Sequence, residues 1–203
     1  MASKKETWKQ FASEIEAEYI QGKGFSQPFI VYSYHGFTII LTMYVVSTGN
    51  SSVTYTTAFV PFENNKDIAF KLVKKNIFHR IFGAKSSKII ITGHDEFDNA
   101  YRIKGNDEIY ISRLFADYDL QALIEKQKQM LLSINKNKGM HKKLYKDINK
   151  KRATVSADDN CLLYYQCTGV IKDKQRLFDL IKLFEKLVDR FVDLNITHHQ
   201  QQS

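Results

Sequence analysis

Phe37-Thr-Ile-Ile-Leu-Thr-Met-Tyr-Val-Val46 is the most apolar stretch of the 203-residue chain, and it decides the fold class. Its ten residues are about half of what a transmembrane helix needs, and their β-branched and aromatic side chains are typical of a buried strand. Strand-like stretches flank it at 28–34 and 52–61, and turn-forming residues separate the three at 35–36 and 48–51. Short turns between strands favour antiparallel hairpins.

Amphipathic helices are predicted at both ends of the chain. Ser3 and Glu6 form a capping-box pattern, and apolar residues follow at helical spacing until Gly22. A second helix is expected from Asp173, its cap, to Leu194, because apolar residues recur there every three or four positions. Helices around strands predict an α+β fold: an antiparallel sheet, or sheets, with both terminal helices packed on it, in one piece or as two similar halves.

The middle of the chain mixes strands with short helices. Strands are expected at 68–73, 88–92, 99–104, 130–135 and 161–171, and helices at 76–82 and, in two pieces, at 107–129. Asp117 is the expected cap of the second piece. We expect one α+β domain over residues 1–197, with a subdivision near 84–106 as the alternative, and a disordered tail at 198–203.

Composition limits the class and the compartment. With 43% hydrophobic residues, 2 prolines and 9 glycines, the chain is neither collagen-like nor a Pro/Gly-rich disordered protein. The first residues lack the apolar stretch of a signal peptide, and no segment is long enough to span a membrane. Cys161 and Cys167 lie on one predicted strand, about 20 Å apart, too far for a disulfide. These features indicate a cytoplasmic protein.

The net charge of +8 comes from the middle of the chain, and its densest part is residues 136–152. Such a segment attracts the phosphates of nucleic acid or of anionic lipid. The alternative is a solvated loop that keeps an edge strand soluble. The candidate binding residues are Lys136, Lys138, Lys142, Lys143, Lys146, Lys150, Lys151 and Arg152.

The most polar constellation lies at 93–102 and includes His94, Asp95, Asp98 and Arg102. These side chains are candidate acid/base groups or ligands of a hard metal. The alternative is a structural turn capped by an aspartate that pairs with Arg102. No phosphate loop, nucleophile elbow, zinc motif or dinucleotide fingerprint is present, so we predict no catalytic residue, metal site or cofactor.

Residues 91–107 resemble a segment of a bacterial family of uncharacterised proteins that share a Phe-Asp…Gly-Asn-Asp pattern. The matching residues are Phe97, Asp98, Tyr101, Gly105, Asn106 and Asp107, and the likeness extends over about 30–195. Some members carry membrane helices before this domain. The resemblance implies no activity or cofactor, and it favours a structural junction in which side-chain acceptors order a turn above anchored aromatics.

Three functions remain open. The first is a non-enzymatic binding or interaction module in a bacterial cytoplasm, with a protein partner or a second copy on the broad apolar face of the last helix. The second is binding of nucleic acid or anionic lipid through 136–152, and the third is an enzyme that uses the 94–98 cluster. The residues expected on the helix face are Leu177, Ile181, Phe184, Val188 and Phe191.

Overall fold

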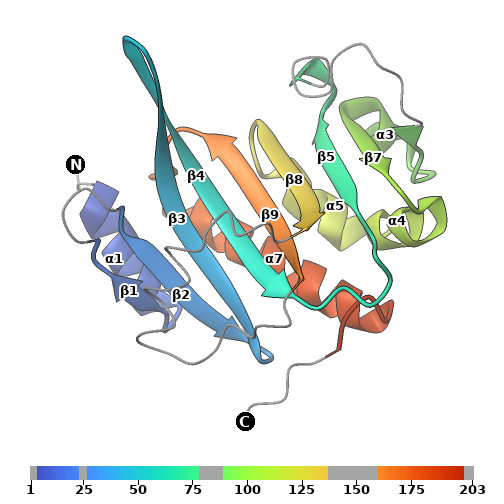
Figure 1. Ribbon diagram of the computed structural model, residues 1–203, viewed down its shortest axis with the longest axis horizontal. Coiled ribbons are helices and arrows are strands. Elements are labelled where there is room, and N and C mark those ends of the chain that lie inside the picture. The colour runs from blue at the N-terminus through green and yellow to red at the C-terminus, as the bar shows by residue number, and fades with distance from the viewer. Residues whose placement is uncertain (1–3, 23–26, 78–88, 137–159, 199–203) are drawn as a thin grey trace.

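One antiparallel sheet runs through the whole computed structural model, which describes residues 4–22, 27–77, 89–136 and 160–198 (Figure 1). Its nine strands follow the order β1-β2-β3-β4-β9-β8-β5-β7-β6. They are β1 (Glu18–Ile20), β2 (Phe29–Tyr34), β3 (Phe37–Thr48), β4 (Ser51–Phe62), β5 (Phe70–Lys74), β6 (Ile89–Ile90), β7 (Tyr101–Gly105), β8 (Met130–Lys136) and β9 (Cys161–Thr168). The predicted α+β class with an antiparallel sheet is confirmed.

The helices of the described residues pack on one face of this sheet. They are α1 (Lys4–Glu14), α3 (Asp95–Ala100), α4 (Glu108–Phe115), α5 (Tyr118–Glu125) and α7 (Lys174–Asp193), with a 3₁₀ turn, η1 (Lys75–Ile77), after β5. In Figure 1, α7 crosses behind the central strands. Between helices and sheet lies one continuous core, which extends from Trp8 to Ile196.

The strand that decides the fold lies inside the sheet. β3 pairs with β2 on one side and with β4 on the other. His35 and Gly36 turn the chain between β2 and β3 with positive φ angles of 47° and 85°. Two successive positive φ values are what a tight type I′ hairpin turn requires, so the predicted turn is confirmed there.

The first helix is shorter than its sequence pattern predicts. α1 ends at Glu14, Glu16 adopts a positive φ of 55°, and the next residues turn into β1, which pairs with β2. The expected continuation to Gly22 is therefore wrong. Hydrogen bonding to β2 stabilises residues 18–20 more than a short extension of the helix would. Trp8 is buried, and its indole nitrogen donates to the carbonyl oxygen of Ile171 over 2.8 Å.

The last helix needs no partner to cover its apolar side. Asp173 caps α7 by accepting from the backbone nitrogens of Gln175 and Arg176, as predicted. The residues expected to form a partner surface are all buried against the sheet: Leu177, Ile181, Phe184, Val188 and Phe191. Self-association stays a prediction, but these side chains do not provide its surface.

The remaining predicted elements are present with shifted bounds. α4 and α5 are the two helical pieces expected after residue 107, and Asp117 caps α5 by accepting from the Leu120 backbone nitrogen over 3.0 Å. Residues 99–100, expected to be extended, instead end the short helix α3. Cys161 and Cys167 are free thiols, buried at the two ends of β9 on the helix-facing side. The expected helix at 76–82 lies largely outside the described residues.

Candidate functional site

The face of the sheet opposite the helices changes character from one end to the other. Strand register places a row of side chains across all nine strands on this face: Glu18, Val31, Ile40, Phe59, Tyr164, Ser133, Lys71, Lys104 and Ile89. Residues on β1 to β4 and β9 form a second, smaller apolar cluster there. On β8, β5 and β7 the row turns polar and basic.

The polar end of this face is hollowed into a groove of about 840 Å³, which we call the sheet groove. Its polar lining comes from Tyr44, Lys71, Lys104, Asn106, Ser133, Asn135, Lys136, Tyr164 and Gln166. Apolar groups, among them Leu131 and Ile134, line the rest. The groove therefore offers cations and neutral donors beside an apolar wall.

Three lysines and no carboxylate line the described part of the sheet groove. Lys71 and Lys104 lie directly opposite each other on β5 and β7, and Lys104 is only 9% exposed. Like charges directly opposite on neighbouring strands destabilise a sheet, and partial burial strengthens the repulsion. Lys136 pairs with Asp67 over 3.7 Å, and both side chains are largely exposed, so that pair is weak. The described lining of the sheet groove is therefore cationic.

A pair of tyrosines orients an amide at the same groove. The phenol groups of Tyr44 and Tyr164 both donate to Oε1 of the Gln166 side-chain amide over 2.9 Å. Burial raises the pKa of both phenols, so they stay protonated donors at neutral pH. Because the Gln166 oxygen accepts from both, its amide nitrogen retains two N–H donors for an acceptor in the groove.

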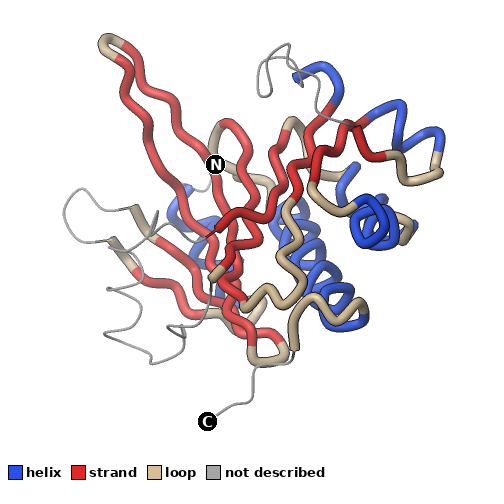
Figure 2. The backbone as a smooth tube through the Cα atoms, turned by 45° about the vertical axis from the view of Figure 1, so that its right-hand side comes forward, coloured by secondary structure: helices blue, strands red, loops and turns tan. Residues whose placement is uncertain are grey.

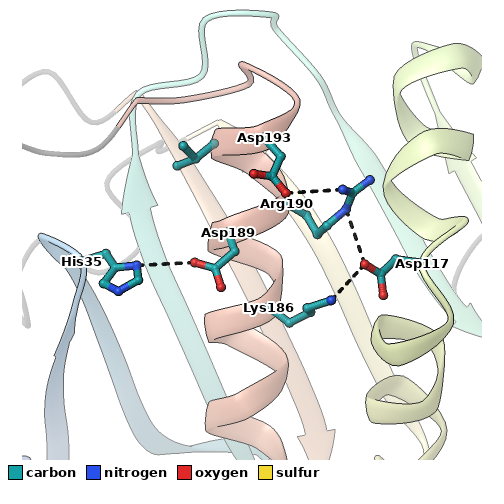
Figure 3. Close-up of a pocket in the computed structure, with 7 residues that line it drawn as sticks. His35, Asp117, Lys186, Asp189, Arg190 and Asp193 are labelled. Atoms are coloured by element: carbon teal, nitrogen blue, oxygen red, sulfur yellow. Dashed lines mark hydrogen bonds and ion pairs between the residues drawn. The ribbon is translucent and has the colours of Figure 1, made fainter.

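A second hollow, the charged cleft, lies beside α7 and has a volume of about 530 Å³ (Figure 3). The Lys186 ammonium lies 3.0 Å from the Asp117 carboxylate, and the Arg190 guanidinium lies 3.7 Å from it. Burial acts to raise the pKa of Asp117, but the Leu120 N–H and these two cations together lower it. These ion pairs join α5 to α7.

The other side of the charged cleft joins β2 to α7. His35 lies 3.5 Å from the Asp189 carboxylate and stacks on Tyr34, whose hydroxyl donates to Asp189 over 3.0 Å. Burial and this carboxylate raise the pKa of Tyr34 to about 12. The charges of the charged cleft are therefore paired with one another, and we interpret it as a structural link between elements.

The predicted polar cluster is used for local structure. The Asp98 carboxylate accepts from the backbone nitrogens of Thr92 and Gly93, both over 3.1 Å. Arg102 donates to the backbone carbonyl oxygens of Asp98 and Tyr101, so the expected pairing with an aspartate side chain is not the one observed. His94 lies edge-on against Tyr118, and Asp95 is exposed. Neither hollow described above is lined by His94, Asp95, Asp98 or Arg102.

The predicted basic segment is described only at its first residue, Lys136, which lies in the sheet groove. Lys138, Lys142, Lys143, Lys146, Lys150, Lys151 and Arg152 lie outside the described residues. Among the residues with described positions, no three His, Cys, Asp or Glu side chains gather as metal ligands would. No helix in this part of the chain combines the length and hydrophobicity needed to cross a bilayer.

Sequence reasoning did not single out the groove residues Lys71, Lys104, Tyr44 and Gln166. Period-two alternation in β5 and β7 was the available signal, because it places each lysine on the face opposite its apolar neighbours. It could not show that β5 lies between β7 and β8, since these strands are not consecutive in the chain.

Comparison of the chain with protein-family models, curated proteins and solved structures finds no match. The resemblance at residues 91–107 therefore stays a prediction.

Proposed function

We propose that the protein is a non-enzymatic binding module that holds a phosphate-bearing ligand in the sheet groove. The observation that carries this proposal is the opposed pair Lys71 and Lys104 in a groove whose described lining residues include no carboxylate. Phosphate oxygens accept from ammonium groups. Gln166 lies farther along the groove, on β9, where its amide N–H groups can donate to other acceptors of the ligand. A bound phosphate would thus make charge-assisted hydrogen bonds with ammonium groups of the groove.

The apolar wall of the groove suits the organic part of such a ligand. Leu131 lines the groove on the same face of β8 as Ser133, and Tyr44 stacks on Tyr55 with ring centroids 5.1 Å apart. Nucleobases stack on aromatic rings, and acyl chains pack on aliphatic side chains. Nucleic acid and anionic lipid therefore share the phosphate chemistry proposed here, and experiment has to distinguish them.

The predicted segment 136–152 fits the same proposal, because it begins at Lys136 in the groove and continues with seven further cations. Its expected contribution is long-range attraction of phosphate. The enzyme hypothesis gains no comparable support, since Asp98 and Arg102 already bind local backbone groups.

The test uses two ligands and two charge-matched variants. Binding of a labelled single-stranded oligonucleotide of about ten nucleotides is followed by fluorescence anisotropy, and binding of phosphatidylserine vesicles by flotation. The groove variant is Lys71→Glu with Lys104→Glu. The control is Lys9→Glu with Lys182→Glu, two exposed lysines on α1 and α7. Both variants have the same net charge.

We expect the groove variant to bind at least tenfold more weakly than the wild type, and the control to stay within about twofold. Affinity of the wild type should fall with rising salt, as phosphate contacts require. Equal losses in both variants would show unspecific attraction and contradict the proposal, as would undetectable binding of both ligands. A loss confined to a third variant, with Lys142, Lys143, Lys150 and Lys151 changed to Glu, would favour the basic segment alone.

A further inference from the structure

The hairpin of β3 and β4 extends beyond the sheet that holds its base. β2 pairs with β3 only as far as Thr42, and β9 pairs with β4 only from Thr56 onward. Residues 43–48 and 51–55 therefore form a two-stranded arm, which we call the ribbon and which projects from the sheet in Figures 1 and 2. Two-stranded hairpins without further support are only marginally stable in water.

The ribbon lacks the usual protection of an exposed strand edge. No Asp, Glu, Lys or Arg occurs between Phe37 and Phe62, and Val45 and Val46 are 46% and 37% exposed. Proteins ordinarily place charges, prolines or bulges on free edges, because such edges template pairing with another chain. Pro61 lies in the part of β4 that pairs with β9, so it does not protect the ribbon.

We infer that the free edge of β3 in the ribbon pairs with the same edge of a second copy of this chain. The edge of β4 is already partly occupied, because Gly169 bridges to Tyr55 and its nitrogen donates to the Thr54 carbonyl oxygen over 2.7 Å. On the β3 side, no strand of the described residues pairs beyond Thr42. Two β3 edges joined antiparallel would give a four-stranded sheet.

The absence of charge makes the ribbon edge self-complementary and so favours a second copy as the partner. In a two-fold symmetric contact each residue near the axis meets its own copy, so any charge there meets a like charge. The ribbon meets this requirement, because no Asp, Glu, Lys or Arg occurs in it. A partner of different sequence would impose no such requirement.

Strand geometry places the axis near the two valines. In an antiparallel pair related by a two-fold axis perpendicular to the sheet, opposed residues point to the same face, so one residue of each strand lies opposite its own copy. Val45 and Val46 are the middle of residues 43–48, so this residue is one of the two valines. The edge involves only residues 43–48 on each side. So short a contact belongs to the small, transient interfaces, and we expect a dissociation constant on the order of micromolar to tens of micromolar.

Analytical ultracentrifugation over about 1–200 μM protein tests this inference in that range of affinity. The wild type should show a reversible monomer–dimer equilibrium. The variants Val45→Lys/Val46→Lys and Val45→Glu/Val46→Glu should each dimerise at least tenfold more weakly, because each places like charges at the axis. An equimolar mixture of these two variants should regain dimerisation, since opposite charges then face each other. Ile109→Lys, at a 66% exposed apolar position on α4, is the control and should dimerise like the wild type.

Circular dichroism checks that the charged variants are folded. Val45 and Val46 are exposed, so their replacement should leave the spectrum unchanged. A wild type that stays monomeric up to the highest concentration would overturn the inference. A dimer that both charged variants form as well as the wild type would overturn it too, as would a mixture that shows no recovery.

Discussion

Gly105, the last residue of β7, allows α4 and the backbone just before β5 to approach β7 closely. A β-carbon at this position would overlap the side chain of Ile111 on α4 and lie 2.7 Å from the carbonyl oxygen of Ala69. The next residue, Asn106, accepts from the Ala69 nitrogen and donates to the Asp67 carbonyl oxygen, and Asp107 caps α4. Each residue of the Gly-Asn-Asp pattern therefore has a structural reason of its own.

Replacement of Gly105 by Ala should lower the free energy of unfolding by about 2–3 kcal/mol, the upper part of the usual cost of overpacking. The backbone oxygen of Ala69 cannot move aside as a flexible side chain would. Urea unfolding followed by circular dichroism measures the change.

Gly49→Ala is the matched control, since a β-carbon there meets no atom within 4 Å and only its positive φ of 59° adds strain. We expect it to cost about 1 kcal/mol. Equal losses at the two glycines would contradict the packing argument.

Asp117 has two separable roles, as the cap of α5 and as the anion beside Lys186 and Arg190. Asp117→Asn keeps a capping side chain and removes the charge, whereas Asp117→Ala removes both. At pH 7 we expect losses of about 1 kcal/mol for Asn and about 2 kcal/mol for Ala.

The pH dependence of these losses has a definite sign. Because the pKa of Asp117 is lowered in the folded protein, its charge stabilises the fold above the ordinary value of about 4. That stabilisation is lost as the pH falls through the folded pKa. The difference between wild type and Asp117→Asn should therefore vanish towards pH 2, and a constant difference from pH 7 to pH 2 would show that the charge contributes nothing.

α7 is the helix that the sequence pattern predicts most completely. Its cap at Asp173, its length and its apolar positions follow from one continuous stretch of the chain, because helical periodicity is local. What covers its broad apolar surface does not follow from that stretch. The sheet and the neighbouring helices cover it, so the helix belongs to the core instead of to an interface.

Leu183→Ala in α7 should therefore destabilise the protein by about 2–5 kcal/mol, as expected for a fully buried leucine. The adjacent exposed Lys182 provides the control, and Lys182→Ala should stay within about 0.5 kcal/mol of the wild type. Thermal and urea unfolding measure both changes. A loss below about 1 kcal/mol for Leu183→Ala would place that side chain outside a packed core.

For the whole molecule, the pairing of β4 with β9 is the decisive contact, because it joins the first hairpins of the chain to strands from its second half. One sheet and one continuous core then predict a single cooperative unfolding transition. The alternative of a subdivision near residues 84–106 would instead give two.

The single tryptophan makes this expectation measurable. Trp8 is buried in α1, near one end of the sheet, so its fluorescence reports on that end, while circular dichroism reports on all elements. Urea unfolding curves from the two probes should coincide. Separate midpoints would show that the chain folds as two units.

The local features of the protein can be predicted from short stretches of its sequence: the hairpin turn at His35-Gly36, the caps Asp117 and Asp173, and the strand and helix patterns around them. Such features depend on dihedral preferences and hydrogen bonds within a few residues, which a single stretch of chain contains. Three further features depend on the tertiary structure: Lys71 lies opposite Lys104, Gln166 lines the same groove from β9, and the apolar side of α7 is covered. These are contacts between strands and helices far apart in the chain, and alternation assigns each residue to a face without stating which strand lies next to it.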